Sequence, residues 1–491
     1  MKKNDYLLLA ATGAYSFLFY QQNAGINFLL FTMTLLVVLI IRNVNLLKQK
    51  KWLWASAMCL ISSGAVFVHS SALSIIANVM SLLLLSAVSF NIATSSLFSF
   101  LFSCWSVMSC VVFVIIDSVK RHTPDIGEEK NKKSYKFVAT LVVLLLSIMF
   151  FNMYKNANPL FAENTKWINF DFISFAWIFF TVGGFLLTYA FLNHKSIAQI
   201  ETWENTLPVN NTIASEELQF LKRFETERYA GLLLFIMLNV MLLVLNYGDI
   251  QTLYFNGGLP KKVTHSDFVH NGVGIMILSI IIATSLIMFL FRKEFVKVKN
   301  NKSLTVCLYL WILQNVVMLS STAMRNQIYI HEFNFTYKRI GVYVWLVLAA
   351  VGLCVMFYKI VKKQSNWFLI RTNVAVWFSV LVLSSVVNWD KLITVYNIQN
   401  KPLAQVDFYY LLSLSDANIP ELLAVTKTPE FKKINNSLKN YTGDRFDAWH
   451  KESYATLFNE KIEHYLLDYT NDWRSFDLRD KNIVESIYLK K

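Results

Sequence analysis

Apolar residues along this chain gather in long blocks that short polar stretches separate. Four of the blocks contain no charged residue: Leu141 to Phe151, Tyr229 to Tyr247, Val273 to Phe291 and Ile340 to Tyr358. A run of ~20 apolar residues spans the ~30 Å hydrocarbon core of a bilayer as a helix, and only helices and closed barrels satisfy their backbone groups there. Barrel strands would alternate apolar and polar residues, and these blocks do not. The pattern therefore predicts an all-α fold, a polytopic bundle of transmembrane helices.

The basic residues beside these segments predict their orientation. The loops at 292–303 and 359–371 contain five and four Lys or Arg, whereas those at 248–268 and 323–339 contain two and three. Because Lys and Arg concentrate in cytoplasmic loops, we expect the first pair of loops on the cytoplasmic side and the C-terminal tail on the outer side. Twelve segments are predicted in all, at 5–20, 25–41, 52–69, 71–90, 95–117, 136–156, 171–192, 229–247, 269–291, 304–323, 339–360 and 370–388.

The first half of the chain does not fit a simple alternation of sides. Its basic stretches at 42–51 and 118–136 both look cytoplasmic, yet three apolar segments lie between them, and an odd number of crossings cannot return to the same side. Either one of the three is re-entrant or does not span, or one basic stretch departs from the rule. We expect the exception at 71–90, which Asn78 interrupts. The prediction is therefore 11 or 12 spans.

Two stretches are predicted to lie outside the bilayer. Residues 193–228 end in charged residues alternating with apolar ones at helical spacing, which predicts a cytoplasmic amphipathic loop. Residues 389–491 predict a small, soluble, helical C-terminal domain on the outer side, following a transmembrane domain at 1–388. Its aromatic helix faces need cover, so we expect it to pack against the loops at 248–268 and 323–339, with Trp473 near the contact.

Composition and charge agree with a membrane protein. Only 16% of the 491 residues are charged, against about 25% in an ordinary soluble domain. The net charge of +14 resides in short loops such as the one at Arg292 and Lys293, which is typical of positive-inside anchors, so nucleic acid is excluded as a partner. The five cysteines lie in apolar segments without metal-ligand spacing. No metal and no cofactor is predicted, and the implied partner is the lipid bilayer.

Residues that could carry chemistry inside the spans are scarce. No charged residue lies near the middle of a predicted span, which argues against a proton-coupled transporter. The polar residues found there, Asn78, Asn239, Gln314 and Asn315, more often join helices than bind substrate. There is no Walker A loop, no zinc-protease helix and no nucleophile elbow. We therefore favour a protein that is not an enzyme, without excluding one.

Three polar-rich stretches are predicted to share the outer face, namely 253–272, 325–339 and the tail, because even numbers of spans separate them. One interpretation is an interfacial belt in which Arg325 snorkels or pairs with Glu332. The other is a binding site for an anionic or polar ligand, or for a protein partner, with the tail as its lid. The candidate binding residues, none of them catalytic or metal-ligating, are Asp267, His270, Arg325, Tyr329, His331, Glu332, Thr336 and Arg339.

These stretches resemble an uncharacterised family of bacterial multi-pass membrane proteins, known only as a domain of unknown function (the 4153/4173 group). The resemblance covers most of the chain and lies in five groups of residues: Tyr254-Phe255 with Asp267-Phe268-Val269-His270; Arg325, Tyr329, Thr336 and Arg339; Asn388-Trp389-Asp390 with Tyr396-Asn397; Asp407, Tyr410 and Pro420; and Asp472-Trp473-Arg474-Ser475-Phe476. Asn334-Phe335 departs from the Gly-Leu turn expected there. The resemblance implies a bacterial cytoplasmic (inner) membrane and brings no activity, cofactor or catalytic residue.

Three functions remain open. The leading hypothesis is a non-enzymatic envelope sensor or scaffold whose outer tail recognises a partner or ligand. The second is a transporter or permease for a small solute, with Asn239, Gln314 and Asn315 along its path. The third is a membrane-embedded lipid or glycan transferase using outer residues such as His270 and Asp267.

Overall fold

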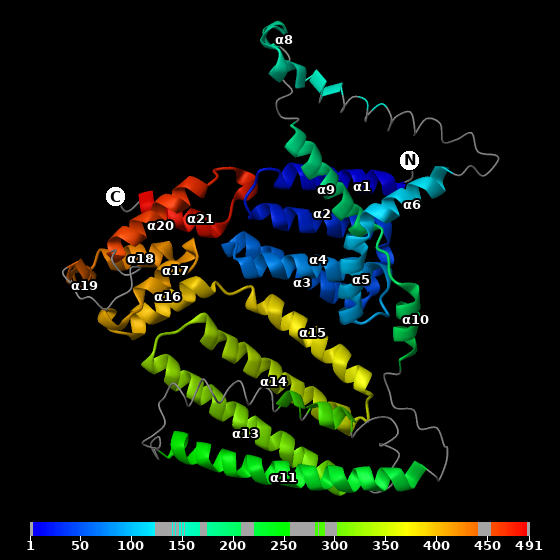
Figure 1. The fold of residues 1–491 in the computed structure, drawn as a ribbon, viewed down its shortest axis with the longest axis vertical. Coiled ribbons are helices and arrows are strands. Elements are labelled where there is room, and N and C mark those ends of the chain that lie inside the picture. The colour runs from blue at the N-terminus through cyan, green and yellow to red at the C-terminus, as the bar shows by residue number, and fades with distance from the viewer. Residues whose placement is uncertain are drawn as a thin grey trace. The chain divides into compact units, whose positions relative to one another are not determined.

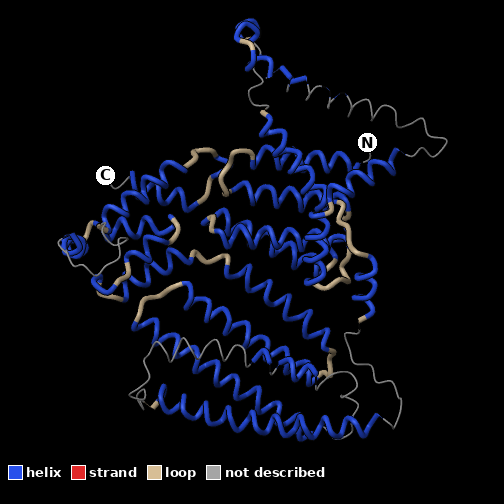
Figure 2. The backbone as a smooth tube through the Cα atoms, viewed as in Figure 1, coloured by secondary structure: helices blue, strands red, loops and turns tan. Residues whose placement is uncertain are grey.

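The described part of the protein is helical throughout (Figures 1 and 2). The computed structural model describes residues 3–122, 153–166, 174–207, 220–255, 302–439 and 453–488, apart from isolated positions, and shorter pieces within 140–151 and 280–289. Over these residues it contains no strand. The chain forms two compact units: Met1–Thr202 with Tyr469–Lys481 is unit 1, and Trp203–Asp468 with Asn482–Lys491 is unit 2.

Unit 1 is a ring of six helices. Each helix packs on the next, and the last packs on the first: α1 (Lys3–Phe19), α2 (Ile26–Arg42), α3 (Lys50–His69), α4 (Ala72–Phe90), α5 (Ser96–Met108) and α9 (Phe175–Leu192). Buried serines allow the close approach of these helices, since their hydroxyls bond to backbone carbonyls, as Ser62 does to Met58 and Ser81 to Ala77. The remaining elements here are η1 (Val44–Lys48), α6 (Cys110–His122), α8 (Pro159–Asn164), α10 (Ala198–Thr206) and η7 (Trp473–Ser475).

The predicted polytopic helical fold is confirmed. Seven described helices are long and apolar enough to cross a membrane, namely α3, α4, α9, α11, α13, α14 and α15, and an eighth span would be the bent pair α5 and α6. The predicted segments at 5–20 and 25–41 correspond to α1 and α2, which are 17 residues long. The two remaining predicted segments, at 136–156 and 269–291, lie largely outside the described residues. The described helices thus support seven or eight of the 11 or 12 predicted spans.

The segment at 71–90 is not the exception, so this expectation is wrong. It forms the continuous helix α4, and Asn78 donates from its buried amide to Cys59 O and Ser62 Oγ of α3, both at 3.2 Å. The break instead divides 95–117, where α6 turns from α5 by 66°. At the break, the Ser109 hydroxyl donates to Trp105 O at 2.5 Å, a back-bond of the kind that bends helices.

The bent pair begins and ends at the same end of unit 1. Before α5, Thr94 O accepts a hydrogen bond from Lys51, at the start of α3. In α6, Asp117 pairs with Lys195 at 3.2 Å, just beyond the C-terminus of α9. Arg42, at the end of α2, donates to Leu192 O at this same end. The basic stretch at 42–51 and Asp117, just before the second basic stretch, therefore both lie at this end of unit 1, with two continuous helices, α3 and α4, between them in the chain.

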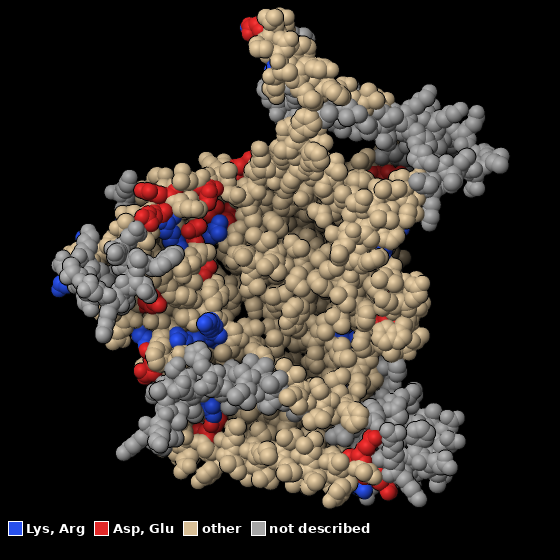
Figure 3. Space-filling model, in the orientation of Figure 1, with Lys and Arg blue, Asp and Glu red and all other residues tan. Residues whose placement is uncertain are grey.

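Unit 2 is built on four long helices lying side by side in the order α11 (Phe220–Tyr254), α13 (Lys302–Glu332), α14 (Tyr337–Val361) and α15 (Asn366–Ser384) (Figure 1). Helices α11 and α13 run parallel, because Asn239 bonds to Cys307 O at 2.9 Å and Asn246 to Gln314 O at 3.0 Å. Helix α11 begins within the stretch predicted as an amphipathic loop. On the face in Figure 3, charged side chains gather near the ends of α11 and not along its middle.

The C-terminal part is helical, as predicted. Its core is aromatic, with the Phe408 ring 5.0 Å from that of Phe431 and 5.3 Å from that of Tyr454. Helix α20 begins at Tyr454, and residues 440–452 before it lie outside the described ones. The elements are α16 (Trp389–Asn400), η4 (Leu403–Gln405), α17 (Phe408–Ser413), η5 (Asp416–Asn418), α18 (Ile419–Thr426), α19 (Pro429–Lys439), α20 (Tyr454–Asp468) and α21 (Leu478–Tyr488).

Candidate functional site

Arg325 forms an ion pair within the helices of unit 2. Its guanidinium on α13 contacts the Asp249 carboxylate on the neighbouring α11, and each side chain is only 7% exposed. Arg325 therefore neither snorkels nor pairs with Glu332, which is exposed at the end of α13. Ionisable groups in spans pair with one another because hydrocarbon offers no other partner. Asp249 is a residue that the sequence interpretation missed.

Arg339 closes the turn between α13 and α14. Its guanidinium lies over the Tyr329 ring, 4.3 Å from the centroid, and donates to Phe333 O at 2.7 Å. Asn326, one turn before Tyr329 on α13, donates to Arg339 O at 3.1 Å. Arg325 and Arg339 therefore serve different partners, and the structure does not bring them together on one ligand position.

The turn itself contains a left-handed residue. Asn334 has φ 32°, a conformation that glycine adopts without strain and asparagine tolerates better than most residues. This explains why Asn can stand where the resemblance leads us to expect Gly. Thr336 is the N-cap residue of α14, but its side chain makes no capping hydrogen bond.

Helix α16 docks on this turn through Asn397. The buried amide of Asn397 accepts from Phe335 N at 2.6 Å and donates to Phe335 O at 2.9 Å. The Tyr396 ring packs on the Phe335 ring with 5.2 Å between centroids, and Asn334 donates to Gln405 O at 3.1 Å. A side-chain amide that satisfies both backbone groups of one residue fixes the relative position of the two segments.

A second set of contacts surrounds the buried carboxylate of Asp390. It accepts hydrogen bonds from the Tyr337 hydroxyl at 2.8 Å and the Ser415 hydroxyl at 2.5 Å. The Tyr410 hydroxyl accepts from Tyr337 N at 3.0 Å, and burial raises the pKa of Tyr410. The start of α14 is thus held to α16, α17 and the segment leading into α18.

The other candidate residues are dispersed. His331 and Glu332 are exposed, and the His331 carbonyl accepts a hydrogen bond from Lys401. Asp267 and His270 lie outside the described residues. Besides Asp249, sequence reasoning did not select Asp390, Asn397 and Tyr410, although these three stand in the stretches that carry the family resemblance. Among the described residues, no group of three or more His, Cys, Asp or Glu could hold a metal ion.

In unit 1, the segment around Ser475 docks on the turn between α1 and α2. Ser475 Oγ accepts from Asn23 N at 3.0 Å and donates to Gln22 at 2.8 Å, and Phe476 O accepts from Ile26 N at 2.9 Å. Arg474 donates to Phe17 O at 2.7 Å. Its neighbour Trp473, which we expected near the loops at 248–268 and 323–339, packs its ring 6.1 Å from that of Phe17.

Comparison with known proteins gives one match, to a family whose activity is not known. No curated protein and no solved structure matches the chain. The match to the family spans residues 7–425, from α1 through α18, and so includes both the transmembrane helices and the docked turn at 333–336. This multi-pass helical membrane protein therefore belongs to the family described as a domain of unknown function, DUF4153.

Proposed function

We propose that this protein is a non-enzymatic sensor or scaffold of the bacterial envelope, anchored in the cytoplasmic membrane, with its C-terminal domain at 389–491 on the outer side. The observation that carries the proposal is the pair of hydrogen bonds between Asn397 and Phe335. These bonds join the C-terminal domain directly to the turn between two spans. A partner that binds the domain would therefore act on the ends of α13 and α14.

The state of the polar side chains supports this function over an enzyme. Arg325 forms an ion pair with Asp249. Arg339 donates to Phe333 O and lies over the Tyr329 ring, and Asp390 accepts hydrogen bonds from two hydroxyls. These groups hold elements together, whereas a catalytic group must be able to reach a substrate. Of the described candidate residues, His331 and Glu332 are the exposed pair, and we propose that they contact the ligand or partner. Arg325 would join α13 to α11, and Tyr329, Thr336 and Arg339 would shape the turn.

The polar residues within the spans support a scaffold over a transporter. Asn239 accepts from Gln314 at 2.7 Å and donates to Cys307 O, which ties α11 to α13. The Asn315 amide bonds to Trp311 O within its own helix at 2.7 Å. Such bonds stabilise helix packing in a bilayer, and with its further bond to Phe235 O the Asn239 amide uses both of its hydrogens within the protein.

The proposal is tested by removing the docking amide and following the phenotype of a deletion strain under envelope stress. Asn397→Ala is expected to insert normally and fail to restore wild-type growth, because the domain no longer engages the turn. Asn400→Ala is the matched control, since Asn400 is exposed on the same helix and bonds only to Tyr396 O. Full complementation by Asn397→Ala would contradict the proposal.

The side of the domain is tested separately by cysteine labelling. In a variant whose five native cysteines are replaced, Asn471→Cys places a thiol at an exposed position of the C-terminal domain. We expect a membrane-impermeant maleimide to label it in intact spheroplasts. Labelling only after lysis would place the domain in the cytoplasm and overturn the proposed orientation.

A further inference from the structure

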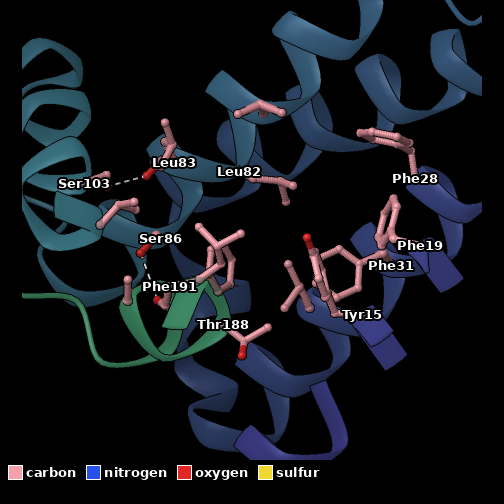
Figure 4. Close-up of a pocket in the computed structure, with 15 residues that line it drawn as sticks. Tyr15, Phe19, Phe28, Phe31, Leu82, Leu83, Ser86, Ser103, Thr188 and Phe191 are labelled. Carbon is pink, nitrogen blue, oxygen red and sulfur yellow. Dashed lines mark hydrogen bonds between the residues drawn. The ribbon is translucent and has the colours of Figure 1, made fainter. Parts of the chain in front are cut away.

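Unit 1 contains a cavity of about 290 Å³ between α1, α2, α4, α5 and α9 (Figure 4). It extends from Phe19 and Phe28, beside the turn between α1 and α2, to Val107 and Phe191, near the opposite end of the unit. Its volume is near the lower end of the ~300–1,000 Å³ typical of small-molecule pockets.

The cavity follows from the break after α5. Helix α5 contributes Ser103 and Val107 to the wall and ends at Met108, where the chain turns away by 66°. Its 13 residues rise only ~20 Å, short of the ~30 Å hydrocarbon core. The ring of helices therefore lacks a full-length member on this side, and the side chains of α1, α2, α4 and α9 do not fill the remaining space.

The wall of the cavity consists mostly of apolar side chains, and its few hydroxyl groups are largely engaged in hydrogen bonds. Its hydroxyl residues are satisfied by the protein, since Ser86 donates to Phe191 O at 2.8 Å, Ser103 to Leu83 O at 2.5 Å and Thr188 to Gly184 O at 2.8 Å. The Tyr15 hydroxyl points into the cavity and makes no hydrogen bond with the described residues (Figure 4). A water would need two to four polar partners, which this wall does not offer.

The cavity opens toward the bilayer between two spans. Val79 on α4 and Leu187 on α9 both line it, yet they are 46% and 44% exposed, so they form its rim. Both helices are candidate membrane spans, and the medium at their exposed faces is therefore hydrocarbon. The molecule with access to this opening is a membrane lipid.

We propose that this cavity binds one acyl chain of a membrane lipid, held between α4, α5 and α9. The chain supplies the dispersion contacts that an empty cavity would lack. The Tyr15 hydroxyl is the donor available to an ester or carboxyl oxygen of the same lipid. This binding does not depend on the outer-face function proposed above.

Native mass spectrometry of the purified full-length protein tests the proposal, after repeated detergent exchange has removed loosely bound lipid. We expect wild-type protein to retain one lipid per chain. The Leu82 side chain points into the cavity in Figure 4. Leu82→Trp should therefore lower the fraction of protein that retains lipid about tenfold, because the indole excludes the acyl chain. Ile76→Trp is the control on α4, at a position that is 53% exposed and outside the cavity.

A second filling variant, Val107→Trp, approaches from the α5 wall and replaces Leu82→Trp if that variant does not fold, as judged by its thermal unfolding. Loss of the lipid in a folded filling variant, with retention in Ile76→Trp, supports the proposal. Wild-type protein that carries no lipid, or folded filling variants that retain it like wild type, would overturn it.

Discussion

Asp249 and Arg325 form a buried ion pair between two parallel helices, 76 residues apart in the chain. Removing one partner leaves the other charge buried without compensation, which costs about 3–5 kcal/mol. We therefore expect Asp249→Leu or Arg325→Met alone to lower the free energy of unfolding by that order. The double variant should recover most of the loss, because an apolar pair of similar volume replaces a buried ion pair at little cost.

Unfolding of the purified protein in detergent micelles measures these differences. Glu332→Gln is the control, because Glu332 is exposed and takes no part in this pair. It should stay within about 0.5 kcal/mol of wild type, as exposed substitutions usually do. A larger loss for Glu332→Gln than for Asp249→Leu would contradict the observed pairing.

Hydropathy located the spans closely, for a physical reason. The segment predicted at 52–69 is observed as Lys50–His69, and that at 71–90 as Ala72–Phe90. A span must be apolar over a length set by the bilayer, so a run of apolar residues of that length marks where the span lies in the sequence. The ion pair of Arg325 cannot be predicted in this way, because the residues around Arg325 do not show which carboxylate lies beside it on another helix.

The sequence places the interruption in the wrong segment, because a polar residue in an apolar run does not by itself break a helix: the bend lies between α5 and α6 and not at Asn78. The Asn78 amide nitrogen donates to Cys59 O and Ser62 Oγ, so this residue joins α4 to α3 and does not interrupt α4. The break at Ser109 lies in a stretch that has no charged residue before Asp117, and the serine there bonds back to Trp105 O. The basic loops lead us to expect an exception among three segments, but which of the three is bent depends on helix contacts that the sequence does not show.

The left-handed turn at Asn334 predicts an unusual order of substitutions. At φ 32°, a residue with a β-carbon is strained by about 1–2 kcal/mol relative to glycine. Both Asn334→Gly and Asn334→Ala lose the bond to Gln405 O, but only alanine adds this strain. We expect chemical denaturation to find Asn334→Ala less stable than Asn334→Gly by about that amount. Equal stability of the two variants would show that the turn is not left-handed.

Asp477 predicts a pH dependence for the docked C-terminal segment. Its side chain is buried, and burial raises its pKa to about 7, outweighing Arg479 at 3.2 Å. Because the folded state holds this proton more tightly than the unfolded chain, with its pKa of 3.8, stability is highest at low pH and falls as the pH rises from 3.8 to about 7. Above that range the loss is complete and stays constant.

Hydrogen exchange of peptides covering 470–480, corrected for the intrinsic effect of pH, measures this change. Protection in the wild type should decrease between pH 5 and pH 8, whereas Asp477→Asn should remove most of the decrease. The asparagine oxygen can still accept the bond that Asp477 receives from Asp480 N at 2.6 Å. Asp480→Asn removes a nearby negative charge that raises the pKa of Asp477, so it should move the decrease in protection to lower pH without removing it. A pH profile unchanged in Asp477→Asn would rule out this carboxyl as its source.

Gly25 predicts how the segment around Ser475 can be released from unit 1. Its φ of −171° is extended and open to any residue, so the constraint is space: a β-carbon here would lie 2.4 Å from Ser475 O and 2.7 Å from Phe476 O. Both atoms belong to the backbone and cannot rotate away. Gly25→Ala must therefore displace the segment and weaken the bond from Ile26 N to Phe476 O.

Limited proteolysis of the purified protein detects this release as faster cleavage within 469–477. Gly13→Ala is the matched control, since a β-carbon at Gly13 meets nothing within 4 Å. Because alanine favours the helix over glycine, Gly13→Ala should gain up to about 1 kcal/mol in stability and leave the cleavage rate unchanged. If Gly25→Ala is cleaved no faster than Gly13→Ala, the segment does not rest on the turn between α1 and α2, and the contacts of Ser475 and Arg474 are not those that hold it.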